Sequence, residues 1–568
     1  MRRTLTIAIV GAGGDGVVVL GTFLQKLAAQ QGYYSQMPRY YGAQIRGGAS
    51  AVKLGLDAER LSLPEDTADV LVCFDWDRYQ ELSDELPLRD DTLVLYDKPP
   101  KGINLPNQSF LVDFTKKSQD VTGSTLNKNM VALGLLERIL AFPPDQIKQT
   151  IDRDEELFLL KDNLAVIEAG EYLFSEFPLP ELELSPAKNP SPKVVLHGNK
   201  AMARGAIHAG CSVFFGYPIT PASEIMQEMQ GELNQGRGVF LQAEDEITAA
   251  GLCIGASLVG EKSLTATSGP GLDLMTEMMG LASAAELPMV IIDVQRCGPS
   301  TGIPSKSEQS DLNHAIYGGH GDAPRVIIAP YDIEGCYRLV MESIDIAQHF
   351  QTPVILLSDQ WLGQTLVATD RDFLEKDYLR TDMKRPVGEE RTSYHRYKLT
   401  EDFISPMAVA GEEGLIYQTT GLAHNEMGVP AFNFQTHQRM HEKRWGKLLP
   451  LCHRHNLVKL FGGAYCKTGI ITWGSSAQIV LKTVRDLGLQ EQIKVCIPEL
   501  VHPLPNKVGQ FLQSIEKLLV IEMNYSGQFY RYLRSQVDLP VKTRVVARAG
   551  GRPFSEKEPS QPITELVQ

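Results

Sequence analysis

The sequence has 568 residues, 43% of them hydrophobic and 22% charged, and its formal net charge is −14 at pH 7. One hydrophobic core does not serve a chain of this length, so several globular domains are expected. The acidic balance argues against nucleic acid as a partner, because phosphate binding needs a basic surface. No apolar run reaches the roughly 20 residues of a membrane span, and the early run at residues 5–10 breaks into glycines rather than a cleavage site. We expect a cytoplasmic protein with no membrane partner.

The cysteine and histidine patterns predict no metal site in this chain. The cysteines stand singly, without a C-x-x-C pair, at positions 73, 211, 253, 297, 336, 452, 466 and 496. Such spacing indicates neither zinc nor an iron–sulfur cluster, and the lack of a disulfide framework fits a reducing cytoplasm. His437 and His441 would share one face of a helix, but no acid or cysteine completes a ligand set beside them.

The first predicted elements are a strand, a glycine turn and a helix. Residues 5–10 indicate a buried strand, Gly11-Ala12-Gly13-Gly14-Asp15-Gly16 a turn, and residues 17–30 a helix. A dinucleotide site also needs an acid about 20 residues further on, and residues 33–36 have none. A thiamine diphosphate–magnesium motif would need asparagines soon after the turn, and none occurs before Asn104. We therefore expect neither NAD, FAD nor a magnesium site here.

Further elements complete a predicted α/β domain over residues 1–176. Three strands and a helix are expected at residues 69–74, 92–96, 109–114 and 127–142. Ahead of them lies a glycine-rich loop that contains Arg39 and Arg46. Guanidinium groups beside free backbone N–H groups suit an acyl-CoA, a phosphate or a carboxylate, although a solvated loop is the plainer interpretation. Residues 177–192 carry five prolines, which predicts an extended linker between domains.

The stretch after the linker predicts a strand that runs directly into a helix. Residues 212–215 are apolar, Gly216 ends the run, and a helical pattern follows Pro221. Pro221 suits the first helical position and Thr220 suits the N-cap before it. Free N–H groups at a helix start favour a small carboxylate or phosphate, and an ordinary strand–helix turn is the alternative.

Similar strand–turn–helix units follow along the chain. A short strand at residues 240–243 ends at Glu244-Asp245-Glu246, where acids complement the dipole of the next helix, while a partly buried Glu246 could also exchange a proton. Strands at residues 262–267 and 288–294 end at Ser268-Gly269-Pro270-Gly271 and Gln295-Arg296. Polar residues at the ends of alternating strands are typical of a doubly wound parallel sheet, whose ligands bind at the carboxyl ends of the strands.

This succession of motifs resembles the α subunit of 2-oxoacid:ferredoxin oxidoreductases. The motifs that carry the resemblance are Tyr217-Pro218-Ile219-Thr220-Pro221, Glu244-Asp245-Glu246, Thr267-Ser268-Gly269-Pro270-Gly271, Gln295-Arg296 and residues 302–312. Gly13-Gly14-Asp15-Gly16-Val17, Tyr41-Gly42 and Arg46-Gly47-Gly48 are similar to that family's γ domain, here fused ahead of the α part. The resemblance covers nearly the whole chain.

The resemblance implies a thiamine diphosphate enzyme that decarboxylates a 2-oxoacid, passes electrons to ferredoxin and transfers the acyl group to CoA. Glu246 matches the glutamate that hydrogen-bonds the aminopyrimidine N1′, which favours the tautomer that takes the C2 proton. Thr220 and Arg296 match residues that hold the substrate's carboxylate and 2-oxo group. The implied cofactor contacts are Tyr217, Pro218, Ile219, Ser268 and Gly269.

The resemblance also implies the domain organisation, a multidomain α/β fold. A Rossmann-like γ-type domain covers residues 1–176, the linker 177–192, a doubly wound pyrimidine-binding domain 193–365, a connector 366–467 and a transketolase C-terminal-like domain 468–568. The last domain is usually a dimerisation module, and its Asn524 could approach CoA. The diphosphate–Mg²⁺ site and the [4Fe-4S] cluster belong to a β subunit in such enzymes, so we expect this chain to act only with that partner, as a dimer of αβ heterodimers.

Several alternatives stay open. A γ–α fusion without cluster motifs is more similar to 2-oxoglutarate enzymes, but pyruvate or broad 2-oxoacid specificity is the alternative. A distal substrate carboxylate would need a second cation, for which Arg39, Arg46 and Lys306 are candidates. A non-catalytic adaptor that kept the fold, and a nucleotide-dependent dehydrogenase built on the glycine turn, are the other hypotheses.

Overall fold

The protein folds into two compact units. The computed structural model describes residues 2–42, 47–59, 63–143, 147, 163–376, 378 and 380–568. The first unit comprises residues 1–197 and 364–375, and the second comprises residues 198–363 and 376–568. None of the described helices is long and apolar enough to traverse a lipid bilayer.

The first unit is built on a mixed sheet in the order β7-β6-β5-β1-β4-β2-β15-β8, with β3 paired to β4. Its strands are β1 (Thr4–Ala12), β2 (Tyr34–Met37), β3 (Arg39–Tyr41), β4 (Ala49–Asp57), β5 (Val70–Cys73), β6 (Leu93–Tyr96), β7 (Ser109–Leu111), β8 (Val194–Leu196) and β15 (Leu366–Thr369). Strands β1, β5, β6 and β7 are parallel, as the predicted strand–helix pattern requires, whereas β4 runs antiparallel to β1 along its whole length.

Strands β2, β3 and β4 were not predicted from the sequence. Every residue of β4 is buried, including Lys53 and Asp57. Lys53 lies in this interior because its Nζ donates to the backbone carbonyls of Asp66 and Glu85, at 3.2 and 3.4 Å. A buried strand that contains a lysine, a glycine and an aspartate lacks the apolar run by which the other strands were found.

The helices of the first unit are α1 (Val17–Gln30), α2 (Trp76–Glu81), α3 (Phe114–Thr122), α4 (Lys128–Ile139) and α6 (Leu164–Glu176). Helices α3, α4 and α6 pack against one another. The contact of α4 with α6 depends on Gly134 and Gly170, since a Cβ on either would lie 2.0 or 2.1 Å from a backbone carbonyl of the other helix. Glycine at both positions lets the two backbones approach closely.

The proline-rich segment 177–192 is extended, as predicted, and it packs on the first unit. Arg2 N donates to Glu183 O at 2.9 Å, and Ser185 N donates to Arg2 O at 2.8 Å. Beyond the segment, β8 and β15 pair antiparallel and complete one edge of the first sheet. The compact first unit therefore includes residues 193–197 and 364–375, which belong to the pyrimidine-binding domain and the connector in the predicted organisation.

The second unit contains a seven-stranded sheet in the order β10-β9-β11-β12-β14-β13-β19. Its strands are β9 (Val213–Gly216), β10 (Val239–Gln242), β11 (Ser263–Thr267), β12 (Met289–Gln295), β13 (Val326–Ile328), β14 (Pro353–Asp359) and β19 (Leu500–His502). All neighbours are parallel except β13 and β19. This arrangement confirms the doubly wound fold, and the strand order reverses between β9 and β11.

Helices follow most strands of this sheet. They are α7 (Gly198–His208), α8 (Ser223–Leu233), α9 (Glu246–Leu258), α10 (Gly269–Leu274), α11 (Thr276–Ala284), α12 (Leu312–Tyr317), α13 (Ile333–Phe350) and α14 (Gln360–Gln364). Helix α13 packs on α7 and on β14. Its buried face carries apolar side chains at helical spacing, among them Leu339, Val340, Ile344 and Ala347.

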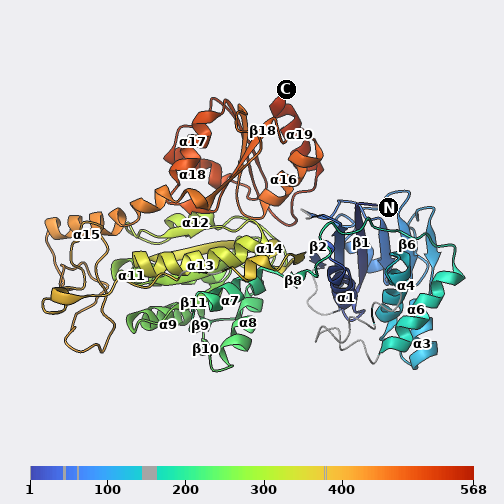
Figure 1. Ribbon diagram of the computed structural model, residues 1–568, viewed down its shortest axis with the longest axis horizontal. Helices are drawn as coiled ribbons and strands as arrows, with labels where there is room; N and C mark the ends of the chain where they lie inside the picture. Colours follow the sequence, from blue (N-terminus) through green and yellow to red (C-terminus); the bar gives the residue numbers. More distant parts are fainter. Residues whose placement is uncertain are drawn as a thin grey trace. The chain divides into compact units, whose positions relative to one another are not determined.

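The C-terminal part of the second unit is a smaller α/β layer, shown in orange and red in Figure 1. Its sheet has the order β16-β18-β17-β20-β21, built from β16 (Val458–Phe461), β17 (Thr468–Thr472), β18 (Ile493–Pro498), β20 (Lys517–Glu522) and β21 (Lys542–Ala547). Helices α17 (Asn506–Ser514) and α18 (Gln528–Gln536) lie on one face, and α16 (Ser476–Asp486) and α19 (Lys557–Val567) on the other (Figure 1). Strand β19 leaves this layer to join the larger sheet, and one buried core includes Ile355 of that sheet and Trp473 of the smaller layer.

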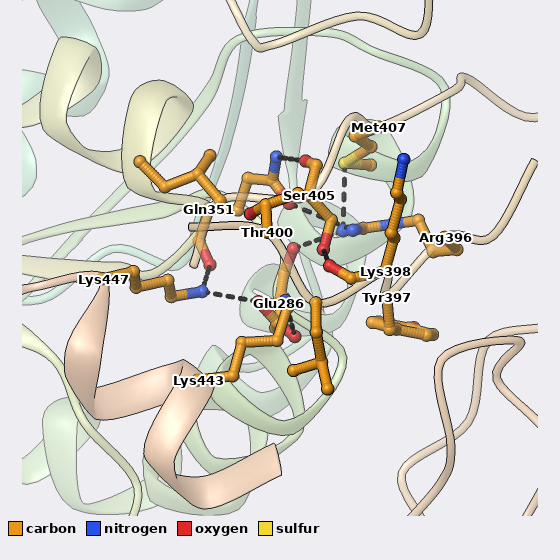
Figure 2. Close-up of polar contacts among 12 residues, drawn as sticks. Glu286, Gln351, Arg396, Tyr397, Lys398, Thr400, Ser405, Met407, Lys443 and Lys447 are labelled. Atoms are coloured by element: carbon orange, nitrogen blue, oxygen red, sulfur yellow. Dashed lines mark hydrogen bonds and ion pairs between the residues drawn. The ribbon is translucent and has the colours of Figure 1, made fainter. Parts of the chain in front are cut away.

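The part of the predicted connector that precedes β16 in the second unit, residues 376–457, is held to the larger sheet layer by a buried ion cluster. Figure 2 shows Glu286, which follows α11, beside Lys443 of α15 (Phe434–Gly446) and Lys447. Lys443 Nζ lies 2.6 and 2.5 Å from the two carboxylate oxygens of Glu286, and Lys447 Nζ lies 3.0 Å from Oε2. Arg396 Nη2 donates to the backbone oxygen of Glu286 at 2.6 Å, and Arg396 Nη1 donates to Gln351 Oε1 at 3.0 Å. We name Glu286, Arg396, Lys443 and Lys447 the connector cluster.

The connector cluster places three cations around one carboxylate in the interior. Burial raises the pKa of Glu286, but Lys443, Lys447 and Arg396 outweigh burial and hold that pKa well below its ordinary value. Burial lowers the pKa of Lys447 to about 7, against the opposing attraction of Glu286. The attachment of the connector therefore depends on one carboxylate and on the charge state of its lysines.

Candidate active site

Four neighbouring parallel strands end at one edge of the larger sheet, and each is followed by a motif singled out in the sequence. Strands β9, β10, β11 and β12 lead respectively to Tyr217-Pro218-Ile219-Thr220-Pro221, Glu244-Asp245-Glu246, Ser268-Gly269-Pro270-Gly271 and Arg296. Since the carboxyl ends of parallel strands lie together, the fold gathers these motifs on both sides of the point where the strand order reverses.

Arg296 connects two of these motifs directly. Its buried side chain donates from Nη1 to the backbone carbonyl oxygen of Thr220 at 2.6 Å. Strands β9 and β12 are not neighbours, because β11 lies between them. The guanidinium therefore spans the end of β11, and Thr220 and Arg296, predicted to act together, do lie together. Burial lowers the pKa of Arg296, whereas the nearby Asp311 and Asp293 raise it.

The prediction that Thr220 caps the following helix is wrong. Helix α8 begins at Ser223, with Ala222 at the N-cap position. A tight turn comes first, in which the carbonyl of Ile219 accepts from Ala222 N and Ser223 N, at 2.8 and 3.0 Å. This turn leaves the Thr220 side chain exposed at the edge of the sheet. Its hydroxyl has no hydrogen-bond partner among the described residues, so it is available to a ligand.

The three acids after β10 divide their roles. Asp245 is the N-cap of α9, and its Oδ1 accepts from Thr248 N at 2.7 Å. Glu244 is exposed, whereas Glu246 is buried. No residue in the described ranges donates a hydrogen bond to the Glu246 carboxylate. Helix capping therefore accounts for the presence of Asp245. Glu246 has no such role and is a buried carboxylate without a hydrogen-bond donor among the described residues.

The turn after β11 lies between two carboxyl groups. A Cβ on Gly271 would lie 2.7 Å from Glu246 Oε1, and a Cβ on Gly269 would lie 2.9 Å from Asp311 Oδ2. Ser268 is fully buried, and its Oγ has no hydrogen-bond partner in the part of the chain that the structure describes. The two glycines thus provide the space in which Glu246 and Asp311 approach this turn, beside an unsatisfied hydroxyl.

A cavity of about 490 Å³ lies between this edge and the C-terminal layer. Its lining includes Gly269, Arg296, Glu308, Asp311, Asn524 and Tyr525. Asn524 itself is buried, and it joins the two layers: its Nδ2 donates to Gln309 O at 3.2 Å, and its Oδ1 accepts from Gln528 N at 3.0 Å. The neighbouring Tyr525 is exposed. Any contact of this loop with CoA stays a prediction.

The predicted cations for a distal carboxylate belong to different units of the chain. Arg39 lies on β3 of the first unit, and Arg46 lies outside the described residues. Lys306 belongs to the same unit as Arg296; it is half-buried, in the loop where its carbonyl accepts from Cys297 N at 3.0 Å. His437 and His441 do share a face of α15, with ring centroids 4.5 Å apart.

Two site residues received no role from the sequence. Asp293 lies within β12 and is fully buried, and Asp311 directly precedes α12 beside Arg296. The available signal was an aspartate within the apolar run Met289–Gln295, since an acid inside a buried strand needs a partner. Burial raises the pKa of Asp293 well above its ordinary value, and burial raises the pKa of Asp311 to about 7.

Comparison with known proteins gives a consistent result over the whole chain. Residues 204–443 match the family model described as "Pyruvate flavodoxin/ferredoxin oxidoreductase, thiamine diP-bdg", and residues 6–171 match "Pyruvate ferredoxin/flavodoxin oxidoreductase". The "2-oxoacid:ferredoxin oxidoreductase subunit alpha" of Sulfolobus sp is 28% identical over 99% of this chain and 97% of its own. The "2-oxoglutarate synthase subunit KorA" of Methanothermobacter marburgensis is 37% identical over 60% of this chain and 90% of its own.

A solved structure extends this similarity to the fold. The 2-oxoglutarate:ferredoxin oxidoreductase from Magnetococcus marinus, determined with 2-oxoglutarate, coenzyme A and succinyl-CoA bound, is 32% identical to this chain. The match covers 100% of both chains with a TM-score of 0.92. The arrangement of the strands that position the motifs therefore occurs in a protein of known structure.

Proposed function

Since the chain belongs to the 2-oxoacid:ferredoxin oxidoreductase family, we propose that it is the α subunit that binds the 2-oxoacid for CoA-dependent oxidative decarboxylation, with 2-oxoglutarate favoured over pyruvate. The observation that carries the proposal is the contact of Arg296 with Thr220 at the same sheet edge as the buried Glu246. An adaptor that kept only the fold would have no need of these three groups together.

Arg296 and Thr220 are the proposed substrate-binding groups. Arg296 uses Nη1 for Thr220 O, and in the described residues no group accepts from its Nε, which is buried. A substrate carboxylate would accept from the remaining guanidinium N–H groups, and such charge-assisted bonds are strong in a buried site. The exposed Thr220 hydroxyl would donate to the 2-oxo oxygen of the same molecule.

The residues at this edge fit thiamine diphosphate, which the description of the matched family model names. Glu246 is a buried carboxylate with no donor among the described residues, and Ser268 Oγ is a buried hydroxyl without a partner. The carboxyl group of Glu246 would donate to N1′ of the aminopyrimidine and share its proton with that nitrogen, with Tyr217, Pro218, Ile219, Ser268 and Gly269 around the ring. When bound, the cofactor supplies the carbon nucleophile for the 2-oxo group.

A partner subunit would cover the exposed apolar side chains around the site. Tyr217, Ile247, Leu274 and Ile303 are 39%, 45%, 49% and 50% exposed, and all lie on segments that follow β9 to β12. Apolar groups clustered at the rim of a site mark a protein–protein contact. The proposed partner is a β subunit that carries the diphosphate–Mg²⁺ site and a [4Fe-4S] cluster and reduces ferredoxin, in a dimer of αβ heterodimers.

Substrate choice depends on a second cation. 2-Oxoglutarate has a distal carboxylate, and Lys306 is the proposed candidate in the same unit as Arg296, with Arg39 and Arg46 as alternatives from the first unit. CoA would enter beside the loop that contains Asn524 and Tyr525, because this loop lines the cavity next to Arg296.

The test is CoA-dependent viologen reduction by the αβ complex, with 2-oxoglutarate against pyruvate. We expect a higher kcat/KM for 2-oxoglutarate. A preference for pyruvate would overturn the choice of substrate and leave the reaction class intact. A complex that assembles with thiamine diphosphate and turns over no 2-oxoacid would instead identify an adaptor.

A further inference from the structure

Asp293 and Asp311 form a carboxyl pair next to the proposed substrate arginine. Asp293 lies inside β12 and Asp311 lies at the start of α12, and each carboxyl group is close enough to influence the pKa of the other. If both were ionised, Asp293 Oδ1, Asp293 Oδ2 and Asp311 Oδ2 would be buried without a hydrogen-bond partner among the described residues. A single proton between the two carboxyls supplies the missing donor.

The groups that face this pair include one cation and two further acids. Arg296 is the cation, and Asp273 of α10 and Glu308 are the acids. Glu308 accepts from Gly298 N at 3.2 Å and from Gly550 N at 3.0 Å. Asp273 is exposed, and its Oδ1 lies 3.4 Å from Nε2 of His314 in α12. Among the described residues that line this cavity, Arg296 and His314 thus face three acids, Asp273, Glu308 and Asp311.

We infer that Asp293 and Asp311 hold one proton between them and position Arg296, and that carboxylate binding at Arg296 is coupled to uptake of a second proton at Asp311. This inference deepens the proposed function and rests on it, because the substrate carboxylate is placed at Arg296. The second proton comes from solvent and removes the remaining negative charge of the pair, while no other bond changes. Both aspartates act as positioning residues through Arg296.

The charge balance of the cavity explains the coupling. Without substrate, the singly protonated pair has one negative charge, which Arg296 neutralises. An arriving carboxylate competes for the same guanidinium and repels the ionised Asp311. Because burial raises the pKa of Asp311 to about 7, this extra repulsion favours its protonation near neutral pH. Substrate affinity therefore falls as the pH rises through about 7, where Asp311 of the free enzyme loses its proton.

Proton uptake can be measured directly on the αβ complex. We would titrate the complex with 2-oxoglutarate, in the absence of CoA, by calorimetry near pH 7.5 in phosphate and in Tris, two buffers with different ionisation enthalpies. The inference predicts a binding enthalpy that differs between the buffers by an amount equal to a sizeable fraction of one proton. Equal enthalpies with measurable binding would overturn it and leave the proposed function standing.

The matched variants are Asp311→Asn and Asp273→Asn, each of which removes one carboxylate from the same cavity. Between about pH 6.5 and pH 8.5 the wild-type KM for 2-oxoglutarate should rise at least about tenfold, as expected for one proton linked to binding. Asp311→Asn should flatten this rise to less than about twofold and abolish the buffer dependence, because an amide does not titrate in this range. Asp273→Asn should retain both the rise of KM with pH and the buffer dependence of the binding enthalpy.

The outcomes distinguish the coupling of substrate binding to proton uptake from the proposed function itself. A purely structural role of Asp311 would shift KM equally at every pH and leave its slope intact, which would contradict the inference. If Asp311→Asn fails to fold, the Asp293→Asn variant or the comparison of buffers with the wild type still tests whether substrate binding is coupled to proton uptake. If no 2-oxoacid binds the complex, the proposed function fails and the inference fails with it.

Discussion

Arg296 reaches past the end of β11 and donates to the backbone carbonyl of Thr220, so a bond of 2.6 Å joins the segments that follow β9 and β12. The acceptor is the backbone oxygen of Thr220, so a substitution of the side chain at position 220 does not remove this acceptor. The bond orients the guanidinium, while the Thr220 hydroxyl stays available. Substitutions at these two positions should therefore have different effects.

Arg296→Lys should lower kcat/KM for the 2-oxoacid by roughly 100-fold, or about 3 kcal/mol, because an ammonium cannot bond Thr220 O and a carboxylate in the same planar geometry. Steady-state kinetics of the complex would measure this. Arg237→Lys is the matched control, since Arg237 lies on the surface and pairs with Glu232. Unchanged kinetics in Arg296→Lys would remove Arg296 from the site.

Glu246→Gln should abolish turnover by the αβ complex, because an amide cannot hold and return the proton at N1′ that is proposed for this carboxyl group. Glu244→Gln, two residues away and exposed, should retain activity. Circular dichroism of both variants would check that the fold is intact. Turnover by Glu246→Gln at the wild-type rate would support an adaptor or a different acid.

Glu286→Gln should destabilise the second unit by roughly 3–5 kcal/mol, because three buried cations would lose their only carboxylate within the connector cluster. Urea unfolding, followed by the fluorescence of the buried Trp473, would measure the loss. Glu412→Gln is the control: Glu412 also binds two arginines of the connector, Arg385 and Arg391, but at the surface. Its substitution should have a much smaller effect.

Stability should rise with pH above neutrality through Lys447. Its pKa is about 7 in the folded protein and about 10.4 in an unfolded chain, so between these values the unfolded state binds more protons. The free energy of unfolding then rises with pH, by at most about 1.4 kcal/mol per unit for one group. Lys447→Met should remove this part of the slope, because methionine does not titrate. Parallel slopes for the wild type and the variant would contradict the prediction.

Thiamine diphosphate should bind the αβ complex much more tightly than this chain alone, because half of the proposed site belongs to the partner. Calorimetric titration of both samples, with spectra to detect cluster absorbance, would show it. Ile247→Asp, at the exposed rim, should weaken assembly, whereas Val541→Asp, exposed on the C-terminal layer, should not. Tight cofactor binding or turnover by the isolated chain would refute a shared site.

Local chain chemistry was sufficient to predict much of the site. Apolar runs that end in Tyr217-Pro218-Ile219-Thr220-Pro221, Glu244-Asp245-Glu246 and Arg296 indicated parallel strands, and the structure places those ends at one edge. Polar groups buried in strands are not evident from local patterns. Lys53 in β4 is stabilised by backbone carbonyls from elsewhere in the chain, and Asp293 in β12 lies beside Asp311; periodicity does not reveal such neighbours.

The sequence by itself determined the parallel strands that end at the site, the doubly wound pattern and the family, because these depend on spacing along the chain. Only the tertiary structure decided that Arg296 bonds the backbone of Thr220, that Thr220 is not a helix cap, and that Asp311 meets Asp293. These contacts join segments from separate strands. Their distances depend on how the sheet, the turns and the buried charges pack together, and no local pattern encodes that packing.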